Sequence, residues 1–141
     1  MAKHSLYLVT YDRGTYHTGK VKPYHWSYFI QINLSGGKNA GIEHQLRGMP
    51  GNFYYPGPED VDLSTIDPSA FKQQLEIGEV EDAKLDRTHQ ILKEIQIDPV
   101  ESSGWNCQNW SLEGFGKLQE EGFTYDWLTK EAVKNWLKEV E

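Results

Sequence analysis

The only cysteine of the chain, Cys107, lies in the segment 102–118 (SSGWNCQNWSLEGFGKL). Serine, glycine and asparagine precede it, and these are typical loop and N-cap residues, so the sequence predicts that Cys107 opens a helix. In a first helical turn, free backbone N–H groups and the positive end of the helix dipole lower the pKa of a thiol. The same N–H groups can stabilise an oxyanion. Cys107 is therefore the candidate nucleophile of a thiol enzyme.

A thiolate nucleophile needs a base within hydrogen-bond distance and a third group that orients the base. His25 lies in the most strand-like segment, 24–34 (YHWSYFIQINL), and we expect it to be the general base. His44 lies in 42–47 (IEHQLR), the expected hairpin partner, and we expect it to orient His25. Neighbouring strand residues point to opposite faces, so only one of His44 and Glu43 can point at His25. The third group is therefore left open between His44 and Glu43.

Three short motifs carry a resemblance to a known family: His25-Trp26-Ser27-Tyr28, Ile42-Glu43-His44 and Asn106-Cys107-Gln108-Asn109-Trp110. Together they resemble the permuted papain-like proteins related to lecithin retinol acyltransferase, within the NlpC-type superfamily of thiol hydrolases. The resemblance runs from His25 to about Leu118. It implies a permuted papain-like fold in which Cys107 is the nucleophile, His25 the general base and His44 the orienting residue. It also implies hydrolysis or acyl transfer on an amide, isopeptide, ester or thioester, through a thioacyl intermediate.

A peptide or an acylated small molecule is the substrate class that fits this chemistry. Aromatic and amide side chains near the motifs are the candidate substrate-binding residues, namely Trp26, Tyr54, Trp105 and Gln108. Cys107, His25 and His44 are all of zinc-ligand type, but a thiolate–imidazole pair needs no metal. We therefore expect neither a metal ion nor another cofactor.

Two other interpretations remain open at this point. Free cysteine is among the most buried residue types, so Cys107 also fits a core thiol in a non-catalytic module that binds a small ligand or a peptide. A biosynthetic condensation or cyclisation in the same pocket is the other interpretation.

Strands precede helices along the chain. Strand patterns occur at 5–11, 24–34, 42–47 and 71–77, and helical periodicity occurs at about 83–95, from 106 or 107 to 122, and at 127–140. This order favours one α+β domain, residues 1–141, with an antiparallel sheet packed against helices. The last helix is expected to dock through one apolar face, formed by Trp127, Leu128, Ala132, Val133, Trp136, Leu137 and Val140.

Composition argues against several classes of partner. The 141 residues include 14 Lys plus Arg and 21 Asp plus Glu, for a formal net charge of -7. An acidic protein lacks the positive field that attracts phosphate backbones, so we expect no nucleic-acid partner. No apolar run has the length of a transmembrane segment or the form of a signal peptide, so the cytoplasm is the expected location. The single cysteine excludes an internal disulfide, and the oligomeric state is left open.

Overall fold

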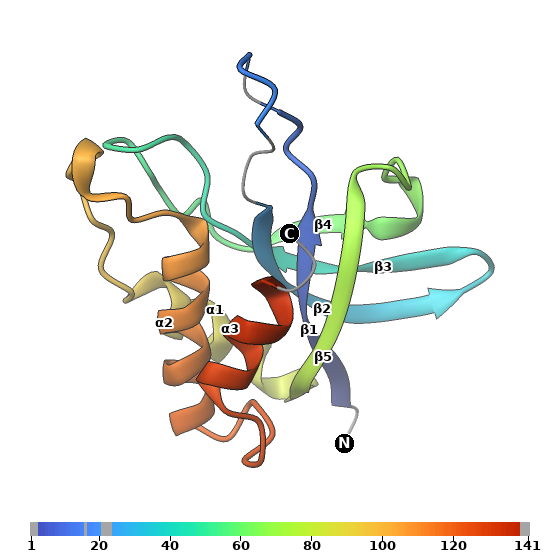
Figure 1. Ribbon diagram of the computed structural model, residues 1–141. Coiled ribbons are helices and arrows are strands. Elements are labelled where there is room, and N and C mark those ends of the chain that lie inside the picture. The colour runs from blue at the N-terminus through green and yellow to red at the C-terminus, as the bar shows by residue number, and fades with distance from the viewer. Residues whose placement is uncertain (1–2, 16, 21–23, 139–141) are drawn as a thin grey trace.

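A five-stranded antiparallel sheet forms the centre of the part of the chain that the structure describes (Figure 1). The structure is a computed structural model that describes residues 3–15, 17–20 and 24–138. The strand order is β4-β3-β2-β1-β5, and each pair of neighbours is antiparallel. The strands are β1 (Lys3–Tyr11), β2 (His25–Ser35), β3 (Lys38–His44), β4 (Glu59–Asp62) and β5 (Phe71–Glu81).

Alternation along the strands gives the sheet two different faces. We call the first the helix face: Trp26, Tyr28 and Ile30 of β2 lie on it, are fully buried, and belong to the same core as the helices. We call the second the far face: Val9 and Phe29 lie on it and form a smaller core with Leu63 of the short 3-10 helix η1 (Leu63–Thr65). Because the side-chain period of a strand is two, consecutive residues of β2 lie on opposite sides of the sheet.

Three α-helices of the described residues lie to one side of the sheet in Figure 1: α1 (Leu85–Lys93), α2 (Cys107–Glu120) and α3 (Lys130–Lys138). A capping box starts α2, because the Asn106 side chain accepts from the helix backbone while the Asn109 side chain accepts from the Asn106 N–H. The Tyr28 hydroxyl of β2 donates to the Ser111 carbonyl of α2. This contact holds α2 against the middle of the sheet.

The α+β class and the antiparallel sheet agree with the sequence prediction, but several element boundaries differ. The third strand starts at Lys38 instead of 42, because Gly36 and Gly37 both adopt positive φ, at 57° and 81°, and close a two-residue turn. Strand β4 (Glu59–Asp62) was not predicted, and its four residues are too few to give a clear alternation. The predicted strand at 71–77 continues for four more residues, so that β5 ends at Glu81.

The last helix begins at Lys130, three residues after the predicted start. Trp127 precedes it, is 74 % exposed and stacks on Tyr125 with ring centroids 5.6 Å apart. Leu128 and Val133 are buried, as expected for the docking face, whereas Ala132 is exposed. The Leu137 side chain and Val140 lie outside the described residues. In the described part of the chain, no helix has both the length and the apolar character to cross a membrane.

Candidate functional site

Cys107 is the first residue of α2, as predicted, but its side chain lies inside the main core. The residue is 2 % exposed and packs in the cluster that contains Trp26 and Trp110. Burial raises the pKa of the Cys107 thiol above its ordinary value, because removal from water disfavours the thiolate. Backbone N–H groups, including that of Gln108, and the charge of Arg13 act in the opposite direction, but burial is the larger cause. In this state the thiol has the environment of a packed core residue.

His25 lies on the far face of the sheet, away from the core that contains Cys107. Trp26, its neighbour in β2, faces the helices, so alternation turns His25 and Ser27 the other way. Among the described residues, the Cys107 sulfur makes no hydrogen bond with His25 or His44. The same residues contain no group of three or more His, Cys, Asp or Glu side chains arranged to hold a metal ion. The three residues predicted to catalyse do not form one hydrogen-bonded triad here.

Both ring nitrogens of His25 are already hydrogen-bonded. The Arg13 guanidinium lies 2.8 Å from Nδ1, and Gln45 Oε1 lies 2.7 Å from Nε2. A guanidinium can only donate, so Nδ1 accepts and the proton of the neutral ring must be on Nε2, which donates to Gln45. Burial, followed by the charge of Arg13, lowers the pKa of His25 from 6.5 to about 4. His25 is therefore neutral at pH 7, and its one lone pair is engaged by Arg13.

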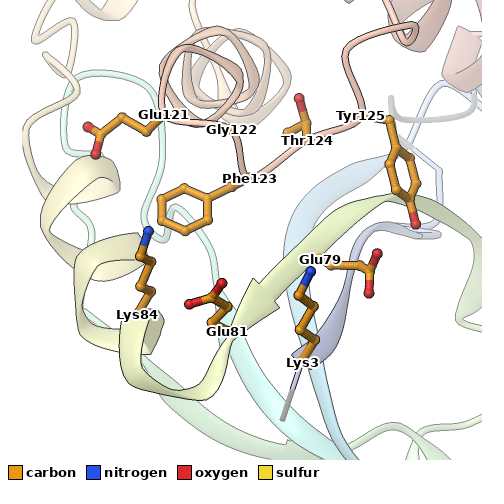
Figure 2. Close-up of a pocket in the computed structure, with 9 residues that line it drawn as sticks. All are labelled: Lys3, Glu79, Glu81, Lys84, Glu121, Gly122, Phe123, Thr124 and Tyr125. Atoms are coloured by element: carbon orange, nitrogen blue, oxygen red, sulfur yellow. The ribbon is translucent and has the colours of Figure 1, made fainter. Parts of the chain in front are cut away.

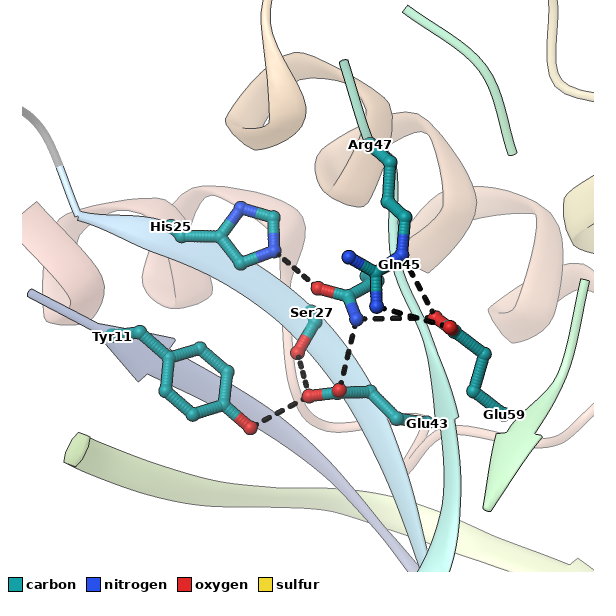
Figure 3. A network of polar contacts seen from close by, with 7 residues as sticks. All are labelled: Tyr11, His25, Ser27, Glu43, Gln45, Arg47 and Glu59. Atoms are coloured by element: carbon teal, nitrogen blue, oxygen red, sulfur yellow. Dashed lines mark hydrogen bonds and ion pairs between the residues drawn. The ribbon is translucent and has the colours of Figure 1, made fainter. Parts of the chain in front are cut away.

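Glu43 is the centre of a buried polar network on the far face (Figure 3). It is 5 % exposed and accepts from the Tyr11 hydroxyl at 2.6 Å, the Ser27 hydroxyl at 2.8 Å and Gln45 Nε2 at 3.0 Å. Of the two candidate orienting residues, Glu43 shares the face of His25, and it acts on His25 through Gln45. The Gln45 amide donates to Glu43, so its oxygen must face His25, and this fixes the His25 tautomer.

His44 lies on the helix face and belongs to a separate cluster. Its Nδ1 lies 2.6 Å from the Tyr55 hydroxyl, which also lies 3.0 Å from Nδ1 of His89 in α1. Burial, followed by the charge of His89, lowers the pKa of His44 from 6.5 to about 4. His44 Nε2 is buried without a hydrogen-bond partner among the described residues. His44 therefore contacts the helix-side core and not the His25 network.

A hollow of about 310 Å³ opens at the far-face end of β1 and β2, and we call it the His25 pocket. Its lining residues are Tyr11, Arg13, His25, Gln45, Leu46, Arg47 and Gly48. Arg47, at its rim, donates to both oxygens of Glu59, at 3.0 and 3.3 Å. The polar groups that face this pocket are carried by strands or the residues next to them, which is a rigid mount for recognition.

A second hollow, of about 170 Å³, lies where the segment after α2 meets the ends of β1 and β5 (Figure 2). Its charged side chains have both signs, and Glu121 is already paired with Arg87. A shallow hollow of about 520 Å³ along α1 and α2 is lined mainly by exposed Glu and Lys side chains. Neither of these two has a buried, hydrogen-bonded side chain of the kind that His25 provides. The residues that line the hollow of Figure 2 are Lys3, Glu79, Glu81, Lys84, Glu121, Gly122, Phe123, Thr124 and Tyr125.

The four predicted substrate-binding residues are placed in different environments. Trp26 is fully buried, and the Gln108 side chain donates to the Tyr24 carbonyl at 3.0 Å. Trp105 is partly buried. Tyr54 is 53 % exposed and pairs with Arg47 through two backbone hydrogen bonds, at 2.8 and 2.9 Å. Tyr54 does not line the His25 pocket itself, but its backbone partner Arg47 does.

Arg13, Gln45 and Arg47 are candidate functional residues that the sequence motifs did not indicate. The alternation rule that separates Glu43 from His44 also places Gln45 and Arg47 on the side of Glu43, so a signal for these two was present. Arg13 required the strand register, in which Tyr11 of β1 pairs with His25 of β2. Two residues beyond that pair, Arg13 can reach back to the imidazole.

A family model described as a family of unknown function (DUF6540) matches residues 6–124. This span contains Arg13, His25, Gln45 and Cys107. No curated protein and no solved structure matches the chain.

Proposed function

We propose that this protein, which belongs to the DUF6540 family, is a non-catalytic module that binds a small ligand or the end of a peptide in the His25 pocket. The observation that carries the proposal is the occupation of both ring nitrogens of His25 by Arg13 and Gln45. A general base must offer a free lone pair to the proton it removes. The lone pair of His25 Nδ1 already accepts from Arg13, so His25 has no free lone pair in this structure. We propose that His25 instead lines the pocket as a fixed polar side chain.

The network behind the pocket supports recognition because it leaves little freedom to the groups that face a ligand. Glu43 fixes the Gln45 amide, Gln45 fixes the His25 tautomer, and His25 holds Arg13. Binding sites gain affinity when their polar groups are ordered before the ligand arrives, since less conformational entropy is then lost on binding.

A ligand screen by NMR tests the binding function. With ¹⁵N-labelled protein, ligands are expected to shift backbone amides in 11–14 and 45–48, which lie at the His25 pocket. His25→Ala removes the residue that holds both Arg13 and Gln45, so it should weaken such ligands about tenfold or more. His17→Ala, at an exposed position outside the pocket lining, is the matched control and should bind normally. Hits that map to the hollow of Figure 2, or that bind His25→Ala as well as the wild type, would contradict the proposal.

Thiol catalysis is the second candidate, and one observation favours it. Cys107 occupies the first turn of a capped helix, where backbone N–H groups lower its pKa. A cysteine at the start of a late helix, after an antiparallel sheet, also supports the permuted papain-like relationship. In this mechanism the Cys107 sulfur attacks the carbonyl of an amide, ester or thioester, and His25 passes the thiol proton to the amine, alcohol or thiol that leaves. Water or another acceptor then attacks the thioacyl enzyme, gives up its proton and releases Cys107 as the thiol. The mechanism needs a second state, in which the Cys107 sulfur is exposed and His25 leaves Arg13 and Gln45 and moves from the far face to the sulfur.

Alkylation separates the two candidates. For the binding module, iodoacetamide at neutral pH should modify Cys107 more slowly than free cysteine, because burial raises the pKa of the thiol and shields the sulfur. The rate should be the same in His25→Ala, since no hydrogen bond joins the two side chains among the described residues. Fast alkylation that slows in His25→Ala would instead favour the thiol enzyme. Mass spectrometry follows the modification directly, because Cys107 is the only thiol.

A further inference from the structure

We infer that the ligand of the His25 pocket carries an anionic oxygen group, a carboxylate or a phosphate, which Arg13 binds. This inference rests on the proposed binding function and specifies its ligand class. The observation behind it is that Arg13 is an exposed cation whose hydrogen-bond partner is a neutral imidazole and not a carboxylate.

Arg13 takes part in none of the ion pairs among the described residues. They are His4–Asp82, Arg47–Glu59, Lys72–Asp12 and Arg87–Glu121. Carboxylates are plentiful in a chain with a formal net charge of -7. Among the described residues, however, the carboxylates next to Arg13 in the chain and around the His25 network have other partners.

Asp12, which is next to Arg13 in the chain, is a carboxylate that already has other partners. One of its oxygens accepts from the Gly14 N–H at 2.6 Å, and the other lies 3.7 Å from the Lys72 ammonium. Glu43 is occupied by hydroxyl and amide donors behind the pocket, and Glu59 is occupied by Arg47. Among the described residues, therefore, no carboxylate pairs with Arg13, and its charge can bind an anion that comes from outside.

The contact with His25 orients the Arg13 guanidinium but uses only one of its hydrogen-bond donors. A guanidinium has about five N–H donors in a planar fork, and the imidazole accepts one hydrogen bond. The remaining donors match the spacing of two oxygens of a carboxylate or phosphate. Because His25 is itself fixed by Gln45, the plane of the fork is set before a ligand binds. His25, Gln45 and Glu43 are thus positioning residues, and Arg13 is the residue that contacts the anion.

The test is a titration of ¹⁵N-labelled protein with sodium acetate in one arm and inorganic phosphate in the other, at constant ionic strength set with NaCl. Saturable shifts are expected at the amides of 11–14 and 45–48 in at least one arm, and the arm that saturates identifies the kind of anion. Arg13→Gln should weaken that binding about tenfold or more, the loss expected for a charge-assisted bidentate contact. Arg13 is exposed, so this variant should keep the wild-type spectrum elsewhere.

Lys72→Gln is the matched control, because it removes the same charge beside Asp12 without touching the pocket lining. Its affinity should stay within about threefold of the wild type, since exposed charges are screened at physiological salt. Equal losses in Arg13→Gln and Lys72→Gln, or no saturable binding in either arm, would overturn the inference. If neutral ligands still shift the pocket amides in that case, the binding function stands without an anionic ligand. If they do not, the binding function fails as well.

Discussion

Because His25 and His44 are buried and neutral, we expect the fold to lose stability when the pH falls from 7 to 5. The pKa of His25 and the pKa of His44 are each lowered from 6.5 to about 4, in both cases mainly by burial. A group with a lower pKa in the folded state binds protons more strongly when the chain is unfolded. Its contribution to stability is therefore present above pH 6.5 and is lost as the pH falls through 6.5 towards 4.

The size of the loss follows from the proton-linkage relation. A shift from 6.5 to about 4 corresponds to a loss of about 2 kcal/mol per histidine between pH 7 and pH 5. Independent action of His25 and His44 would give about 4 kcal/mol in total. For a chain of 141 residues, 1 kcal/mol moves the melting temperature by about 3 °C, so each histidine accounts for about 6 °C.

Urea unfolding at pH 7, 6 and 5 measures this effect. The free energy of unfolding should fall with pH in the wild type, and the fall should be about 2 kcal/mol smaller in His25→Asn and in His44→Asn. His17→Asn, at an exposed position, should keep the full wild-type slope. Both buried-histidine variants are compared by slope, so a general loss of stability at pH 7 does not affect the result. Wild-type slopes in His25→Asn would refute the assignment of a buried, neutral His25 bound by Arg13.

Two further predictions concern the far-face network and the packing of α2. Burial, followed by the charge of Glu43, raises the pKa of Tyr11 above its ordinary 10.0, so the wild type should lose stability as the pH rises above 10. Burial also raises the pKa of Tyr28 and of Tyr55, so Tyr11→Phe should show a smaller alkaline loss than the wild type and not a complete absence of it. The variant should cost about 2 kcal/mol at pH 7 in urea unfolding, because Glu43 loses a donor. An alkaline loss equal to that of the wild type would contradict the Tyr11–Glu43 contact. A Cβ on Gly114 would lie 2.9 Å from a methyl carbon of Leu92, whose side chain is fully buried and cannot move into solvent, so Gly114→Ala should cost about 1–3 kcal/mol. Gly116 faces open space, so Gly116→Ala should stabilise the protein by about 0.5–1 kcal/mol. Thermal melts compare the two variants, and equal effects of the two alanines would refute the close packing of Gly114 against Leu92.

Local signals in the sequence were sufficient for the main elements. The alternating aromatic and β-branched residues of 24–34 predicted β2, and Asn106 before Cys107 predicted the start of α2. Both features act within a few residues of the chain, because a strand is favoured by its own side-chain pattern and a capping box closes over one helical turn. The sequence alone therefore indicated the α+β class and the placement of Cys107 at a helix start.

The tertiary structure decided which side chains meet. Alternation showed that Glu43 and His44 must face opposite ways, but it did not show that His25 faces away from the helices, because that depends on which side of the sheet the helices cover. The hydrogen bonds of Arg13 and Gln45 to His25 depend on strand register, and register is set by contacts between residues far apart in the chain. The burial of the Cys107 sulfur likewise depends on how α2 seats on β2. Residue types identified the groups capable of chemistry, and only the packing of sheet and helices determined which partners each one has.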